Sequence, residues 1–155
     1  PQKINVYFPG ADAACPRCNI PSADLYHMLW GCPSICGYWT YVTTQLEALS
    51  GNSDLNKWEA AALGIYHRPK KRKAMNRFID MAFILALKLL TGAWKARASP
   101  SPKRWLGDLV NWAVAEHALL VGEEARGMRK FPLAPTWNAL LTKFQSLNKD
   151  DHLPP

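Results

Sequence analysis

The chain has 155 residues, 48% hydrophobic and 20% charged, so it can bury one core and is not disordered by composition. Nineteen Lys and Arg against twelve Asp and Glu give a net charge of +7. No apolar run approaches the roughly 20 residues of a membrane helix, and the first residues lack the apolar segment of a signal peptide. These features exclude a membrane protein, a small secreted disulfide scaffold and a disordered tail. Because the sequence does not begin with Met, we expect a piece of a longer protein.

All four cysteines lie near the start of the chain. Cys15, Cys18, His27 and Cys32 follow the pattern C-x2-C-x8-H-x4-C. Zinc binds four soft or borderline ligands at tetrahedral corners, and a CxxC turn supplies two thiolates from one tight knuckle. The pattern predicts a closed, structural Zn²⁺ site that leaves no coordination position for a substrate. A disulfide, a redox CxxC and buried free thiols are the alternatives, but nothing indicates secretion or a βαβ setting.

Cys36 is a second candidate for the fourth ligand, in place of Cys32. Its position inside the next predicted helix favours a packed thiol instead. Because a zinc knuckle has little core of its own, removal of the metal is expected to unfold at least the first 50 residues.

Hydrophobic periodicity predicts helices after an irregular lead-in over residues 1–21. Ser22 is expected to cap a short helix that carries His27. A second helix is predicted from Pro33 to Gly51, which is a typical C-terminal stop. Its apolar stripe comprises Ile35, Trp39, Val42, Leu46 and Leu49.

The rest of the chain also reads as helical. A short segment with Leu55, Trp58, Ala62 and Leu63 ends near Gly64. Residues 73–97 form a helix that is apolar on more than one side, and we expect it to be the most buried element. Ser101 and Pro102 open the next helix, whose stripe includes Trp105, Leu106, Leu109, Trp112, Ala113, Glu116 and Leu120. Thr136 is expected to cap a last helix with Trp137, Leu140, Leu141 and Phe144.

These elements predict an all-α fold, in which a zinc knuckle is followed by a small bundle of about four to five helices. We divide the chain into a zinc-knuckle region with the first amphipathic helix, 1–50, a basic helical region, 51–147, and a frayed tail, 148–155. We expect them to form one compact unit.

The positive charge is concentrated in the middle of the chain. Between Ala60 and Gly107 there are eleven basic residues and one acid, Asp80. Such a block suits a polyanion, and interleaved aromatic residues favour nucleic acid, while a solvated surface is the alternative. The predicted phosphate contacts are Arg68, Lys70, Lys71, Arg72, Lys73 and Arg77, extended by Lys95, Arg97, Lys103 and Arg104. Arg17 and exposed rings such as Tyr26 or Trp30 could add base stacking; for Trp30 we favour core packing.

Catalytic motifs are missing from the sequence. It has no Gly-rich phosphate loop and no Gly-x-Ser-x-Gly elbow, and acids are sparse where the chain is most basic. We therefore expect the fragment not to be an enzyme and to have no small-molecule substrate.

Three blocks resemble one family. The first is Cys15-Pro-Arg-Cys18 through His27-Met28-Leu29-Trp30-Gly31-Cys32-Pro33, followed by Tyr38-Trp39. It is similar to the cysteine–histidine region near the C-terminus of LINE-type (non-LTR) retrotransposon proteins. The second, Leu87 to Lys95 with Ser99-Pro100-Ser101-Pro102 and Trp105, is similar to that family's apolar helix, Trp-Lys pair and Pro-containing break. A weaker third block is Arg129-Lys130-Phe131 with Trp137.

The resemblance implies that Cys15, Cys18, His27 and Cys32 are the metal ligands. It also implies a non-catalytic module that holds template RNA or target DNA during target-primed reverse transcription. Its partners would be RNA or DNA and the remainder of the reverse transcriptase polypeptide, with no membrane, in a cytoplasmic ribonucleoprotein and the nucleus. The alternative is a docking module in which Lys70 to Lys73 is a nuclear-localisation signal. A cellular transcription factor is disfavoured, since no repeated fingers or DNA-reading helix are recognisable.

Overall fold

A computed structural model describes residues 13–94, 97–127 and 134–149 of the chain. Within these ranges the regular elements are all helices and no strand occurs, so the all-α prediction is confirmed. Among the described helices, none has the length and apolar character needed to cross a membrane.

The helices follow one another in a simple order. Two short elements, the π-helix η1 and the 3₁₀-helix η2, precede the long helices, and a 3₁₀-helix η3 separates the first two α-helices. Their bounds are η1 His27–Gly31, η2 Pro33–Ile35, α2 Cys36–Ser50, η3 Ser53–Leu55, α3 Trp58–Leu63, α4 Lys73–Gly92, α5 Pro102–Ala125 and α6 Ala134–Lys149.

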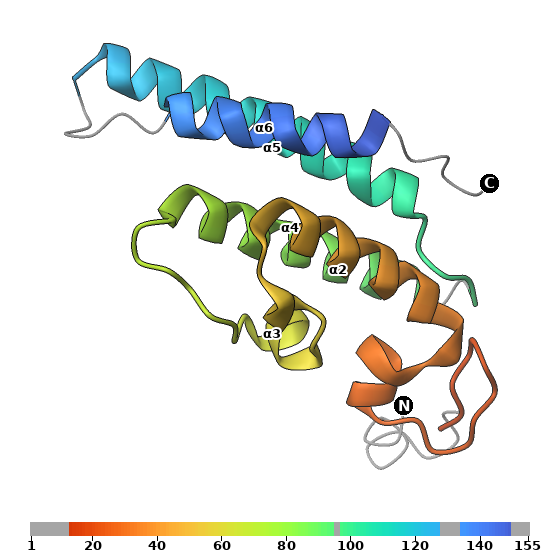
Figure 1. Ribbon diagram of the computed structural model, residues 1–155. Coiled ribbons are helices and arrows are strands. Elements are labelled where there is room, and N and C mark those ends of the chain that lie inside the picture. Colours follow the sequence, from red (N-terminus) through yellow and green to blue (C-terminus); the bar gives the residue numbers. More distant parts are fainter. Residues whose placement is uncertain (1–12, 95–96, 128–133, 150–155) are drawn as a thin grey trace.

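Figure 1 shows two layers of long helices. Helices α2 and α4 lie side by side in one layer, and α5 and α6 form a pair that covers them. The short α3 packs beneath α4, and the segment that contains η1 lies at the end where α2 begins. Helix α4 contacts α2, α3, α5 and α6. The expectation that it would be the most buried element is wrong, since eight of the 15 residues of α2 are buried against seven of the 20 residues of α4.

Aromatic side chains fill the space between the layers. The Phe78 ring lies 5.1 Å from that of Phe144 and 6.1 Å from that of Trp137, all three fully buried. Buried indole N–H groups need acceptors, and Trp105 Nε1 donates to the carbonyl of Ala82 at 2.9 Å. The Trp105 indole is thus satisfied inside a largely apolar core.

The second predicted helix agrees closely with the structure. Its five stripe residues are all buried, and Gly51 ends it in the left-handed conformation at a φ of 68°. Gly64 ends α3 in the same way, and Ser101 caps α5 by accepting a hydrogen bond from the Arg104 amide.

Two helix starts differ from the sequence prediction. Ser22 is not a cap: it has a φ of 57°, and the side chain of Asp24 accepts from the His27 amide at 2.7 Å instead. A carboxylate at this position satisfies a helix-start amide as well as a hydroxyl does. At the other end of the chain α6 begins at Ala134, so Thr136 lies inside the helix.

Burial in α3 and α4 follows only part of the apolar sequence pattern. In α3 the buried residues are Ala60 and Ala61, while Leu63 is 56% exposed. Helix α4 ends at Gly92 rather than Arg97: the Ala93 amide still donates to the Leu89 carbonyl as in a helix, but the Trp94 amide donates to the Thr91 carbonyl at 3.2 Å and leaves the helical pattern. Its outer side leaves Ile84 56% exposed, so the helix is buried on one broad side only.

Candidate metal centre and basic surface

The first half of the metal centre is a tight turn. Cys15 and Cys18 lie at its two ends, where the Asn19 amide donates to the Cys15 carbonyl at 2.8 Å. Asn19 has a φ of 60°, a left-handed conformation that asparagine tolerates better than most residues. The Cys15 amide donates back to the Ile20 carbonyl at 2.9 Å and closes the loop. Local hydrogen bonds therefore bring the two thiols to one side.

The second half comes from η1. His27 is its first residue, and Cys32 follows its last residue in an extended conformation. A π-helix pairs residues five apart, which is the spacing of His27 and Cys32. The sequence indicated a helical turn here, but only the structure identifies it as the wider π turn.

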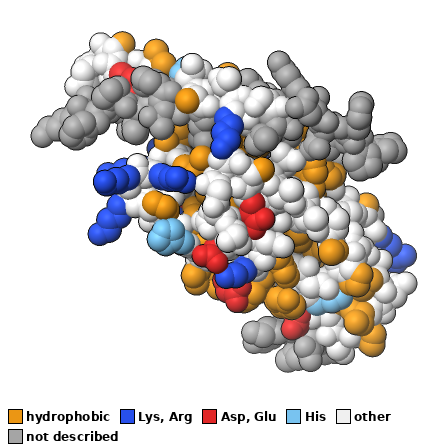
Figure 2. Space-filling model, viewed as in Figure 1, with side chains coloured by type: hydrophobic (Ala, Val, Ile, Leu, Met, Phe, Trp, Pro, Cys, Tyr) orange, Lys and Arg blue, Asp and Glu red, His pale blue; other side chains and the backbone are white. Residues whose placement is uncertain are grey.

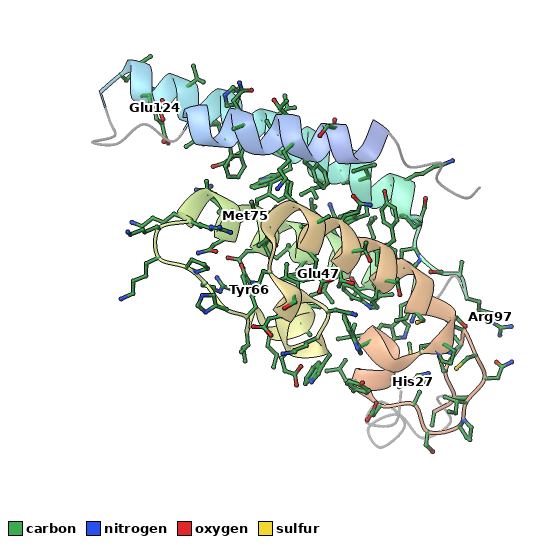
Figure 3. The ribbon with its side chains drawn as sticks, viewed as in Figure 1. His27, Glu47, Tyr66, Met75, Arg97 and Glu124 are labelled. Carbon is green, nitrogen blue, oxygen red and sulfur yellow. The ribbon has the colours of Figure 1, made fainter. Side chains whose placement is uncertain are left out.

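The four side chains converge. Their ligand atoms all lie within 4.8 Å of one another. Cys15 Sγ and Cys32 Sγ are 3.8 Å apart, and Cys18 Sγ lies 3.3 Å from His27 Nε2. A tetrahedron built on Zn–S bonds of about 2.3 Å has edges of about 3.8 Å. This donor set and spacing fit a tetrahedral metal ion, and Figure 3 labels His27 at this end of the molecule.

The surroundings affect the two buried thiols in opposite ways. Burial by itself raises the pKa of Cys15, but the amides of Cys18 and Arg17 and the side chains of His27 and Cys18 lower the pKa to about 6. Burial raises the pKa of the Cys32 thiol, and the Ser34 amide offsets this only in part. Backbone N–H groups directed at Cys15 thus favour the thiolate that a metal requires.

Cys36 stands outside this cluster. It is the first residue of α2 and its side chain is exposed. The prediction that it would be a packed thiol is therefore wrong, because the first turn of α2 faces solvent there. It does not join the four converging ligands.

Arg17 and Trp39 fasten the knuckle to the bundle. The Arg17 guanidinium donates to the carbonyls of Met28 and Leu90, each at 3.0 Å. Trp39 Nε1 donates to the Leu29 carbonyl at 2.7 Å, and the Trp30 ring lies 5.0 Å from that of Trp39. Arg17, a predicted nucleic-acid contact, is thus engaged within the protein, and Trp30 packs against the core as favoured.

The exposed ring near the knuckle is that of Tyr26. It is 47% exposed and meets Trp58 edge to face at 5.6 Å. A Cβ on Gly31 would lie only 2.8 Å from this ring, so a larger residue at this position would displace the ring.

Three arginines of the basic block also have protein partners. Arg68 forms a two-pronged ion pair with Asp80, at 2.7 and 2.8 Å, and stacks on the Tyr66 ring. Arg72 donates to the Ser50 carbonyl at 2.9 Å. These contacts hold the 64–73 loop against α4 and the end of α2.

Arg77 is the third. It pairs with Glu116 of α5 at 2.8 Å, and the Glu116 side chain is only 8% exposed. Leaving such a carboxylate unpaired would be costly. The structure therefore gives Arg77 a role between two helices, in addition to any contact with phosphate.

Lys70, Lys71 and Lys73 differ from these arginines. All three are exposed, and none has a side-chain partner within the described ranges. Figure 2 shows Lys and Arg side chains gathered at the edge of the molecule where this loop runs. We call these three residues the loop lysines.

The remaining predicted contacts lie at the opposite end of α4. Arg97, Lys103 and Arg104 are exposed around the start of α5, and Lys95 falls outside the described residues. The 20 residues of α4 span about 30 Å. Figure 3 shows the separation through the labelled residues, with Met75 near the start of α4 and Arg97 beyond its end. The predicted basic residues thus form two groups rather than one track.

The comparisons with known proteins found no match among protein-family models, curated proteins or solved structures. The geometry itself defines a Cys₃His cluster suited to a metal ion at one end of an all-α bundle, with basic groups at both ends of the central helix.

Proposed function

We propose that the chain is a non-catalytic, zinc-binding and nucleic-acid-binding module of a LINE-type retrotransposon reverse transcriptase protein. The main support is the convergence of Cys15, Cys18, His27 and Cys32 within 4.8 Å. These are the four residues that the family resemblance implies as ligands.

Zinc is the metal that suits this donor set best. Three thiolates and one imidazole at tetrahedral spacing are typical of structural Zn²⁺ sites, whereas hard cations prefer oxygen ligands. With four protein ligands no open position remains, so the metal stabilises the fold and performs no chemistry on a substrate.

Nucleic-acid binding would start at the loop lysines. They are exposed cations without protein partners, on a loop whose neighbouring arginines fix its backbone. Contacts of this type neutralise phosphates without reading sequence. The module would then hold template RNA or target DNA near the polymerase of the same polypeptide, in the cytoplasmic ribonucleoprotein and in the nucleus.

The test is binding of the zinc-loaded protein to single-stranded RNA and to duplex DNA, measured by fluorescence anisotropy across a salt series. We expect steep inverse salt dependence, with a slope of about −0.7 to −0.9 per neutralised phosphate. The variant Lys70→Ala/Lys71→Ala/Lys73→Ala should lose about two to three units of slope, while the Lys→Arg triple variant keeps it. Absence of binding by the unaltered protein at low salt would overturn the proposal.

A second candidate is a docking module with a nuclear-localisation run. It is favoured by exposed apolar side chains on the knuckle and near α3, namely Ile20, Leu25, Tyr26, Leu63 and Ile65. Under this alternative the alanine triple variant would still bind RNA but would fail to enter the nucleus in an import assay.

A further inference from the structure

A cleft opens between the end of α4 and the start of α5. Its volume is about 780 Å³, within the range of pockets that hold small molecules, roughly 300–1,000 Å³. The residues that define its chemistry are Lys88, Leu89, Thr91, Ala93, Pro100 and Arg104. Two separate segments form the walls, the last turns of α4 and the 99–104 stretch.

The charges of the cleft have a single sign. Lys88 contributes from α4 and Arg104 from α5, both exposed and neither with a side-chain partner in the described parts of the chain. No acidic residue belongs to the described lining. Two unpaired cations at one opening attract an anion with more than one charged oxygen, such as a phosphate group.

The rest of the lining is mostly apolar. Leu89, Ala93 and Pro100 are half-buried or buried and present an apolar wall, and the Ser99 hydroxyl is exposed at the rim. An apolar wall beside paired cations matches a ligand that joins a flat heterocycle to a phosphate. A bare inorganic anion would leave that wall in contact with water.

We propose that this cleft binds one nucleotide of a single-stranded nucleic acid, with its phosphate between Lys88 and Arg104 and its base against Leu89, Ala93 and Pro100. The inference rests on the proposed nucleic-acid function and specifies a second contact for it. The nearest loop lysine, Lys73, lies about 22 Å from Lys88 along α4, the rise of 15 helical residues. A stacked strand rises about 3.4 Å per nucleotide, so about six to seven nucleotides separate the two contacts.

The main experiment compares two double variants with equal charge change at the same end of the molecule. Lys88→Glu/Arg104→Glu alters the cleft, and Arg97→Glu/Lys103→Glu alters exposed cations outside its lining. For a 12-nucleotide single strand we expect the cleft variant to weaken binding about tenfold and the control about two- to threefold. Equal weakening by the two variants would overturn the cleft. Circular dichroism melting checks that both variants fold.

A second measurement identifies the ligand. Backbone amide resonances of 88–93 and of the non-proline residues in 99–104 are followed by NMR during titration with a 4-nucleotide strand and, separately, with inorganic phosphate. The strand should shift both segments in the unaltered protein and shift neither in the cleft variant. Equal shifts at equal concentrations of phosphate would contradict a nucleotide site and indicate a simple anion site.

The outcomes separate this inference from the proposed function. If the unaltered protein binds no strand at low salt, the proposed function fails. If it binds, and the loop-lysine variant weakens binding while the cleft variant behaves as its control, only the cleft proposal fails. A 4-nucleotide strand is too short to span both contacts, so the gain in affinity from 4 to 12 nucleotides should disappear in the cleft variant.

Discussion

The knuckle and the bundle obtain their stability from different sources. In residues 13–35 the fully buried apolar side chains are few, chiefly Met28 and Ile35, and two of the other buried residues are the ligands Cys15 and Cys32. Helices α2 to α6 instead enclose large aromatic rings such as those of Phe78 and Trp105. Local hydrogen bonds and a metal can thus order one region, while apolar burial orders the other.

The two regions meet through apolar packing, in which Met28 and Ile35 join the core, and through specific hydrogen bonds. Arg17 joins the CxxC turn to the last turn of α4, and Trp39 joins α2 to η1. Helix α2 itself packs on α4, α5 and α6, so it belongs with the bundle. Metal loss should therefore affect residues 13–35 more than helix α2, which follows them. From the sequence we expected at least the first 50 residues to unfold, and the structure limits the expected unfolding to the part before α2.

The largest expected effect is that of metal removal. Zinc binding to small knuckle-like sites is worth about 10–16 kcal/mol near neutral pH, and the knuckle has little else to order it. With chelator, amides of 13–35 should lose their hydrogen-exchange protection while those of α2 and α4 keep theirs. Cys18→Ser should have the same effect and Cys36→Ser should not, since Cys36 is exposed outside the cluster. Unchanged protection in the metal-free protein would contradict a metal-dependent knuckle.

Removal of the buried Trp105 ring should destabilise the helical bundle. Trp105 is fully buried and its indole donates to Ala82, so Trp105→Ala should lower the free energy of unfolding by about 3–5 kcal/mol. Urea unfolding followed by circular dichroism measures it. Leu119→Ala serves as the control because Leu119 is 63% exposed. A similar loss in both variants would argue against the described core.

A smaller effect is expected where the regions join. Arg17→Ala removes two charge-assisted hydrogen bonds to the carbonyls of Met28 and Leu90, and we expect a loss of about 2 kcal/mol. In the protein without the substitution, the bundle should melt at a higher temperature with zinc than without it. In the variant this difference should shrink, and a difference of full size would show that Arg17 does not couple the regions.

The smallest effect is expected between α4 and α5. Arg77→Ala leaves the Glu116 carboxylate unpaired, but the arginine is 57% exposed and water can replace it in part, so we expect a loss of about 1 kcal/mol. In the double variant Arg77→Ala/Glu116→Gln most of this loss should be recovered, because no buried charge remains. Thermal unfolding of the four proteins of this cycle gives the coupling free energy.

Helix positions were predicted best where the signal is local. The stripe from Ile35 to Leu49 and the stop at Gly51 depend on residues a few positions apart, and both agree with the structure. The end of α4 was predicted less well, since residues up to Arg97 continue a helical pattern. The chain leaves the helix at Gly92, where Trp94 turns to pack against the core.

The candidate metal site was predicted almost completely, since its four ligands come from one stretch of 18 residues, Cys15 to Cys32. For the candidate phosphate contacts, the sequence revealed only a block rich in Lys and Arg and not how these side chains are arranged in space. The sequence could not show that Arg68 would form an ion pair with Asp80, since the two residues lie twelve positions apart. It also gave no signal that Lys88 and Arg104 would line one cleft.

The sequence by itself determined the all-helical class, the convergence of four ligand residues and the excess of basic charge. Each depends on residue type and short spacing, which act through local backbone geometry. Only the tertiary structure decided which cations are engaged and which are exposed, because partners such as Arg17 and Leu90 are separated by 73 positions. It also divided the basic block into two groups, because α4 is a rigid rod that separates residues at its two ends by its full length.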